Sequence, residues 1–271
     1  MPTIYSPSRV HTGQLNILAY HGINPHGADR LTVSPSLFAA QMEWLDQSGA
    51  QVVPLAEGVS RLRRGDPSRL VSITFDDGYA DFADFAAPIL ARRGFPATLF
   101  VVADKIGGVA DWPGATSQCC LLSSDELRHL LAQGHSIGSH SATHASLTHL
   151  MAADLQAELR GSRRRLEQSV GISPAAFAYP YGAFGKRERD AVVEAGYGCA
   201  CGIRGWSNAR DADLFALRRI EMWAGYSMRE FEALMTARFK WPRLTRAAKH
   251  IVGEIQHAVV GHHSKSTLTN Y

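Results

Sequence analysis

Strand-like apolar runs alternate with helical patterns along most of this 271-residue chain. Because parallel strands need long connections to return to the same end of a sheet, this alternation predicts a parallel sheet with helical crossovers. The expected strands are residues 15–20, 51–55, 70–75, 97–102, 135–139, 175–179, 197–201 and 216–221, and the expected helices are residues 36–49, 79–93, 124–132, 152–170 and 186–195. Seven or eight such units indicate an α/β fold of the (β/α) barrel type, whose chemistry lies after the carboxyl ends of the strands.

Two adjacent carboxylates, Asp76 and Asp77, follow the third expected strand and are themselves followed by Gly78. Like charges this close raise each other's pKa unless a positive group lies beside them. A metal ion would remove the difficulty, and His140 and His144 follow the fifth expected strand. One aspartate and two histidines leave coordination positions open, which is typical of a catalytic metal site. Each motif alone is more often a solvated turn or a helix surface, so it is their joint placement at strand ends that predicts a site.

A third motif, Tyr-Pro-Tyr-Gly at residues 179–182, follows the sixth expected strand and places a rigid loop at the same edge. Together with Thr-Phe-Asp-Asp-Gly and His-Ser-x-x-His, in this order, it resembles the motifs of the polysaccharide deacetylases, the NodB-homology or carbohydrate esterase family 4 group. The resemblance runs from about residue 15 to about residue 222. It implies a distorted (β/α) barrel of about seven parallel strands, in agreement with the alternation.

The resemblance also implies an activity, the removal of the N-acetyl group from an N-acetylated aminosugar or glycan intermediate with release of acetate. On this pattern Asp77, His140 and His144 hold a divalent metal, and Asp76 is the general base. Spacing alone leaves open which aspartate is the ligand and which the base. The backbone N–H of Tyr181 is the expected oxyanion donor. The ligand set suits Zn²⁺, while Fe²⁺, Co²⁺ and Ni²⁺ also fit it.

Two departures from the family pattern concern charge and proton transfer. Many relatives have an arginine in the third motif, where this chain has Ala178, and a late Leu-x-His, where this chain reads Leu-Arg-Arg-Ile at residues 217–220. We therefore expect Arg219 to lie beside Asp76 as a catalytic substitute for the missing arginine, with a surface or salt-bridged arginine as the alternative. For the missing proton donor the candidates are Asp76 itself and His21, at the tip of the first strand.

Candidate substrate contacts are aromatic and loop residues expected near the same edge. They are Tyr179, Pro180, Trp112, Trp206 and His21. Trp112 lies in the insertion at residues 107–114, where an exposed indole could stack on a sugar ring and where packing within the loop is the alternative. Other functions that keep the metal site are deformylation, O-deacetylation and hydrolysis of a small non-sugar amide. A carbohydrate-binding protein without catalysis would not need the aspartates and histidines that this chain retains.

Charge and cysteine spacing exclude several other functions. The formal net charge of +3 is too small to argue for nucleic acid binding. The four cysteines are Cys119, Cys120, Cys199 and Cys201, whose spacing does not match zinc ribbons and predicts buried free thiols. The first 13 residues lack the apolar core of a signal peptide, and no window reaches the roughly 20 apolar residues of a membrane span. With Met1 as the native start, we expect a cytoplasmic protein acting on substrates such as sugar nucleotides, lipid-linked sugars or free aminosugars.

The character of the chain changes near residue 226. We expect residues 1–226 to form the barrel, and residues 227–271 to form a basic amphipathic helical extension with a polar tail. Such a helix packs on the barrel with its basic face in water, or it makes a peripheral contact with an anionic membrane surface. Ser227 followed by Glu230, like Ser123 followed by Glu126, is a capping-box pattern that predicts the start of a helix.

Overall fold

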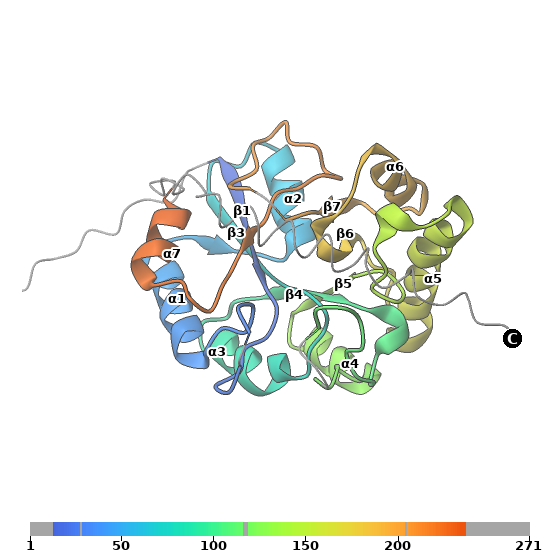
Figure 1. Cartoon of the computed structure of the whole chain (residues 1–271). Coiled ribbons are helices and arrows are strands. Elements are labelled where there is room, and N and C mark those ends of the chain that lie inside the picture. The colour runs from blue at the N-terminus through green and yellow to red at the C-terminus, as the bar shows by residue number, and fades with distance from the viewer. Residues whose placement is uncertain (1–12, 28, 116–118, 204, 237–271) are drawn as a thin grey trace, which may run out of the picture. The chain divides into compact units, whose positions relative to one another are not determined.

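The strands form one parallel sheet that curls into a half-barrel (Figure 1). The computed structural model describes residues 13–27, 29–115, 119–203 and 205–236. The strands are β1 (Gln14–Tyr20), β2 (Gln51–Val52), β3 (Arg69–Phe75), β4 (Ala97–Val101), β5 (Ser136–Ser139), β6 (Ala176–Ala178), β7 (Cys199–Cys201) and β8 (Ile220–Glu221). Seven of them follow the order β7-β6-β5-β4-β3-β1-β8, and β2 pairs with the first half of β3. The predicted barrel of about seven parallel strands is confirmed.

Helices connect the strands as the sequence patterns predict, with one addition. The helices are α1 (Pro35–Gln47), α2 (Leu55–Arg63), α3 (Ala87–Ala91), α4 (Ser124–Ala132), α5 (Ala152–Val170), α6 (Lys186–Glu194) and α7 (Met228–Met235). The helix expected at residues 79–93 consists of a π-helical turn at Phe82–Ala86 followed by α3. Both predicted capping boxes are present, at the starts of α4 and α7. The unpredicted helix is α2.

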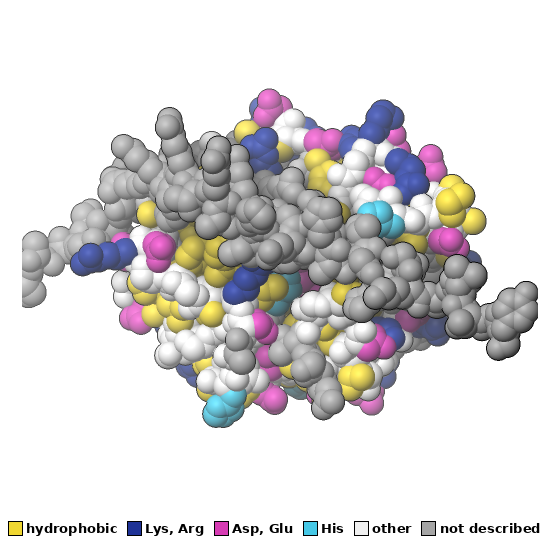
Figure 2. Space-filling model, viewed as in Figure 1, with side chains coloured by type: hydrophobic (Ala, Val, Ile, Leu, Met, Phe, Trp, Pro, Cys, Tyr) yellow, Lys and Arg dark blue, Asp and Glu magenta, His cyan; other side chains and the backbone are white. Residues whose placement is uncertain are grey.

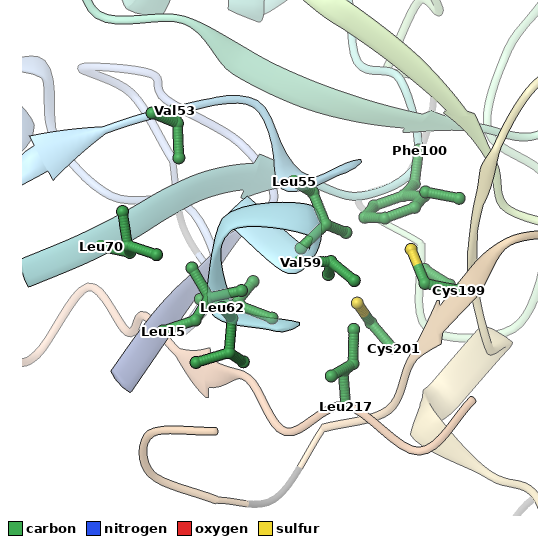
Figure 3. Packing of buried hydrophobic residues seen from close by; sticks show 13 residues of the cluster. Leu15, Val53, Leu55, Val59, Leu62, Leu70, Phe100, Cys199, Cys201 and Leu217 are labelled. Atoms are coloured by element: carbon green, nitrogen blue, oxygen red, sulfur yellow. The ribbon is translucent and has the colours of Figure 1, made fainter. Parts of the chain in front are cut away.

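An apolar cluster joins α2 to the sheet (Figure 3). Its α2 members are buried with side chains from β1, β3, β4, β6 and β7. The approach is close, because a Cβ atom at Gly58 would lie 2.9 Å from the Ser72 hydroxyl oxygen and 3.0 Å from a methyl group of Leu15. Only glycine lets the helix lie so near β1 and β3. The backbone N–H of Leu55 donates to the Thr98 hydroxyl at 3.1 Å and so satisfies one free donor at the helix start.

The four cysteines are free thiols, as predicted, but they are not all buried. Cys199 and Cys201 alternate with Ala200 along β7, so their side chains share the face that packs into the cluster of Figure 3. Cys119 is half-buried and Cys120 is exposed, in the segment that leads to α4. The prediction of burial is therefore wrong for Cys120, whose side chain is exposed although those of Leu121 and Leu122 beside it are buried.

The start of the predicted C-terminal extension packs on the barrel. The Phe231 ring of α7 contacts the Trp44 ring of α1 edge-on, at 5.6 Å between centroids. The rest of the predicted extension, residues 237–271, lies outside the described residues, so its basic helix and membrane contact stay predictions. No helix within the described ranges is long and apolar enough to cross a bilayer.

Side chains of both charges intermingle on the surface of Figure 2. On the part of this face that the described residues form, Lys and Arg side chains alternate with Asp and Glu. Large fields of a single sign, which nucleic-acid-binding proteins use to attract phosphates, are absent from that part. This distribution agrees with the small net charge of the chain.

Candidate active site

The candidate site lies at the carboxyl ends of the parallel strands. The backbone N–H of Asp76 donates to the Tyr20 carbonyl at 2.9 Å, which extends the pairing of β3 with β1 by one residue. In the same way, the His140 N–H donates to the Val101 carbonyl at 2.9 Å and extends the pairing of β5 with β4. The backbone thus fixes where the first aspartate and the first histidine project. The first two motifs are therefore delivered to one edge of the sheet, and Tyr181 of the third contacts the His144 ring there.

Asp77, His140 and His144 converge as the sequence predicts. Their candidate ligand atoms all lie within 4.8 Å of one another, and all three residues are buried. Asp77 Oδ1 is 3.5 Å from His140 Nε2 and 3.3 Å from His144 Nε2. It is buried and has no hydrogen-bond donor among the described residues.

These distances suit a metal better than mutual hydrogen bonds. Ligand atoms about 2.0–2.1 Å from a tetrahedral zinc ion lie about 3.3 Å from each other. A buried carboxylate oxygen without a donor is costly, and a cation at the centre of the cluster would remove that cost. The residues present therefore fit a divalent metal.

The His140 imidazole is prepared to act as a ligand. Its Nδ1 lies 2.9 Å from the Ala178 carbonyl oxygen, so Nδ1 carries the proton and donates it to that bond. Nε2 then presents a lone pair toward Asp77. Burial lowers the pKa of His140 to about 4, which keeps the ring neutral near pH 7. Metals bind the neutral form of imidazole.

Aromatic contacts hold the His144 imidazole. Its ring stacks on Trp112 at 4.6 Å between centroids, with 20° between the planes, and meets the Tyr181 ring edge-on at 4.6 Å. The Nδ1 atom of His144 is buried and has no hydrogen-bond partner among the described residues. Ring packing therefore sets the direction of Nε2, as a hydrogen bond does for His140.

Backbone strain is concentrated in the three motifs. Among the described residues, the non-glycine residues with positive φ are Asp77 (72°), Ser141 (66°), His144 (66°) and Tyr181 (58°). Each such residue costs on the order of 1–3 kcal/mol and persists only where its surroundings over-determine it. Strain of this kind clusters at functional sites, and here it affects two of the three candidate ligands and the predicted oxyanion donor.

Arg219 forms a buried ion pair with Asp76, so the expected contact is present. Arg219 Nη1 and Nη2 donate to Asp76 Oδ1 and Oδ2 at 2.6 and 2.7 Å. The guanidinium also donates to the Gly202 carbonyl and the Thr74 hydroxyl, and it lies over the Phe100 ring. Burial alone raises the pKa of Asp76, but the charge of Arg219 and its neighbours outweighs burial and lowers that pKa. Asp76 is therefore an anion at neutral pH.

His21 lies beside the same carboxylate. Its Nε2 is 3.9 Å from Asp76 Oδ2, which is beyond hydrogen-bond distance. Its Nδ1 is buried without a hydrogen-bond partner among the described residues. The structure thus brings together His21, directly after β1, Asp76, directly after β3, and Arg219, directly before β8.

The predicted substrate contacts divide into core and surface residues. Tyr179 is fully buried: its hydroxyl donates to the Phe215 carbonyl at 2.9 Å and its ring stacks on Phe184. Pro180 is also buried. The prediction that Tyr179 contacts substrate is therefore wrong, because its side chain packs in an apolar core cluster. The contact of Pro180 with substrate stays a prediction. Tyr181, by contrast, is 40% exposed, beside the candidate ligands.

The two tryptophans predicted to contact substrate differ in burial. The expectation of an exposed Trp112 is wrong, since its side chain is buried against His144. The alternative, a tryptophan that packs its own loop, is the one observed. Trp206 is half-buried in the loop that follows β7, and its contact with substrate stays a prediction.

Comparison with known proteins relates the fold and motifs to one family. The sequence model described as polysaccharide deacetylase matches residues 63–200. YxkH of Bacillus subtilis, which carries a provisional polysaccharide deacetylase name, is 29% identical over 222 residues, 81% of this chain and 75% of that protein. A Staphylococcus aureus protein named poly-beta-1,6-N-acetyl-D-glucosamine N-deacetylase is 26% identical over 192 residues, 67% of this chain and 64% of that protein. The solved structure of Streptococcus pyogenes deacetylase PplD with acetate has the same fold, with a TM-score of 0.72 at 22% identity over 82% of this chain and 98% of that chain.

Proposed function

Because the chain belongs to the polysaccharide deacetylase family, we propose that it is a metal-dependent hydrolase of N-acetyl groups. Its substrate would be an N-acetylated aminosugar or glycan, and its products acetate and a free amine. The observation that carries the proposal is the buried cluster of Asp77, His140 and His144. Asp76, which precedes Asp77 in the chain, is ion-paired with Arg219. A metal site beside an anionic base is what amide hydrolysis at neutral pH requires.

Metal binding, proton transfer and oxyanion stabilisation would be the work of different residues of the site. Asp77, His140 and His144 would hold one divalent metal, which we propose is Zn²⁺ and which supplies Lewis acidity that polarises the amide carbonyl and lowers the pKa of water. Asp76 would take the proton from the attacking water, since its lowered pKa keeps it ionised. The backbone N–H of Tyr181 would donate to the developing oxyanion.

Proton delivery to the leaving amine needs a second step. Asp76 is protonated once water has attacked, and it can return that proton to the amine nitrogen. His21, with Nε2 at 3.9 Å from Asp76, is the alternative carrier. Arg219 cannot serve, because a guanidinium does not release its proton in this pH range. Its role is to position Asp76 and to keep it ionised.

Arg219→Lys is expected to lower the rate and move the acidic limb of the pH–rate profile to higher pH. Lysine keeps a positive charge but loses the paired bonds to both Asp76 oxygens. Arg219 lowers the pKa of Asp76, so weakening the pair lets that pKa rise and leaves the base protonated over a wider acid range. Metal content should not change.

The control for this prediction is Arg218→Lys, at the neighbouring exposed position. It should leave both the rate and the profile as in the wild type. Arg219→Ala is less informative, because removing one partner of a buried ion pair costs about 3–5 kcal/mol and can unfold the protein. An unchanged acidic limb in well-folded Arg219→Lys would refute the role given to Arg219.

The proposed function is tested by comparing N-acetyl and O-acetyl substrates. The name of the Staphylococcus aureus relative supports β-linked N-acetylglucosamine oligomers as the first substrates. We expect equimolar acetate and free amine from these oligomers, and little acetate from O-acetylated sugars. Acetate released from the O-acetyl esters alone would replace the proposal with an esterase that uses the same site.

A further inference from the structure

The loop from His140 to His144 needs an external support. It contains Ser141 and His144, both with φ of 66°, a region that L-residues rarely adopt. Such a loop keeps its conformation only if bonds from its surroundings hold it there. The position of the His144 ring relative to Asp77 depends on that conformation, because the two candidate histidine ligands are joined through it.

Backbone N–H groups bond to two carbonyl groups of this loop. Ala103 and Asp104, in the turn that follows β4, donate to the carbonyls of Ser141 and Ala142 at 3.1 and 2.9 Å. Within the loop, the N–H of His144 donates to the Ser141 hydroxyl oxygen at 3.0 Å. The N–H groups of Ala142 and Thr143, between Ser141 and His144, need acceptors from elsewhere.

Glu158 of α5 accepts hydrogen bonds from these two N–H groups. Its Oε2 accepts from the N–H of Ala142 at 2.9 Å and from that of Thr143 at 3.0 Å. Its Oε1 accepts from the Thr143 hydroxyl at 2.6 Å. One half-buried carboxylate therefore makes three bonds to the centre of the loop, and bonds to an ionised acceptor are about twice as strong as neutral ones.

The helix that carries Glu158 is itself tied to the turn on the other side of the loop. Arg165, also on α5, donates to Asp104 Oδ1 at 3.0 Å. The same Asp104 supplies a backbone donor to the Ala142 carbonyl. One helix thus supports the loop directly through Glu158 and indirectly through the turn at Ala103–Lys105.

We propose that Glu158 is a positioning residue that holds the His140–His144 loop in the conformation that binds metal. The inference rests on the proposed function in taking these histidines as ligands. Glu158 accepts from the backbone at Ala142 and Thr143, so it acts on the imidazoles through the loop that joins them. Loss of its carboxylate leaves two N–H groups without their partner and frees the strained loop to relax. The direction of the His144 ring would then no longer match Asp77.

Metal affinity is the first test, with Zn²⁺ itself as the probe in competition with a chelator. Outer-shell partners typically contribute about 10–100-fold to metal affinity, so we expect a loss of that size in Glu158→Ala. Glu158→Gln keeps one oxygen that can accept both N–H groups, and it should bind with intermediate affinity. Glu167→Ala, at an exposed position of the same helix, is the matched control and should bind as the wild type does.

Amide hydrogen exchange of the metal-free protein is the second test. The Ala142 and Thr143 amides should exchange at least about 10-fold faster in Glu158→Ala, since they lose their acceptor, while amides of α4 exchange at the wild-type rate. If Glu158→Ala does not fold, Glu158→Gln provides both measurements. Equal Zn²⁺ affinity and equal exchange in the Glu158 and Glu167 variants would overturn the proposal. A wild-type protein that binds no Zn²⁺ would instead refute the proposed function, and faster exchange in Glu158→Ala would still establish the support of the loop.

Discussion

Replacing His140 by alanine is expected to strip most of the metal from the purified protein and to abolish activity. His140 supplies one of three converging ligand atoms, and its Nε2 is aimed at Asp77 because Nδ1 is bonded to the Ala178 carbonyl. The loss in affinity should exceed the roughly 10–100-fold that follows from removing an outer-shell partner. Elemental analysis of protein purified without added chelator measures the metal content per chain.

The half-barrel should remain folded in this variant. His140 lies at the edge of the sheet, directly after β5 ends, so its replacement removes no apolar side chain from the core. His149→Ala, at an exposed position in the turn that follows the loop, is the matched control and should retain its metal. Full metal occupancy in folded His140→Ala would refute the ligand assignment.

Asp76→Asn is expected to keep the metal and lose about 10²–10⁴-fold in rate, the usual contribution of a general base. Asparagine has nearly the shape of aspartate but cannot accept the proton from water. The variant also leaves the buried Arg219 guanidinium without its counter-charge, so a lower melting temperature should accompany the lower rate. Metal analysis, circular dichroism and acetate release on the same preparation separate these effects.

The two aspartates are told apart by comparing their asparagine variants. Asp77→Asn should lose metal as well as activity, because Asp77 Oδ1 is the oxygen that faces both histidines. Asp84→Asn, at an exposed position a few residues later, should change neither. A variant pair in which Asp76→Asn empties the site and Asp77→Asn leaves it filled would reverse the two roles.

The metal cluster could be predicted from the sequence because each of its parts is local. Asp77 lies two residues after a buried strand and His140 directly after another, so parallel pairing alone brings them to one edge. Arg219 could be predicted from a pair of departures from the family pattern, a missing cation in one loop and an extra one on the last strand. Its bond to Asp76 is the result that such compensation would give.

The burial of Tyr179 in the third motif also follows from the sequence, once the alternation of side chains along a strand is taken into account. Side chains alternate between the two faces of a strand, so Tyr179 shares the face of Phe177. Both pack in a cluster with residues of α5 and α6, whereas Ala176 and Ala178 face the cluster that contains α2. Tyr179 therefore points away from the site by parity.

Other features depend on contacts that no local pattern contains. Gly58 lowers the helical propensity of α2, and it is needed there only because Ser72 and Leu15 lie so close. Trp112 lies in a loop that the sequence predicts to be exposed, and its burial comes from stacking on His144 and from packing in an apolar cluster with Val102 and Leu121. Glu158 is an ordinary helix residue until α5 docks beside the histidine loop.

Acetate release from an N-acetylglucosamine oligomer, measured before and after metal removal, tests the central claim most directly. The wild-type protein should release acetate and free amine in equal amounts, lose this activity on chelation, and recover it when Zn²⁺ is added back. Asp76→Asn should release almost none although its metal site is filled. Undiminished release by the chelated protein, or by Asp76→Asn, would contradict the assignment of the reaction to this site.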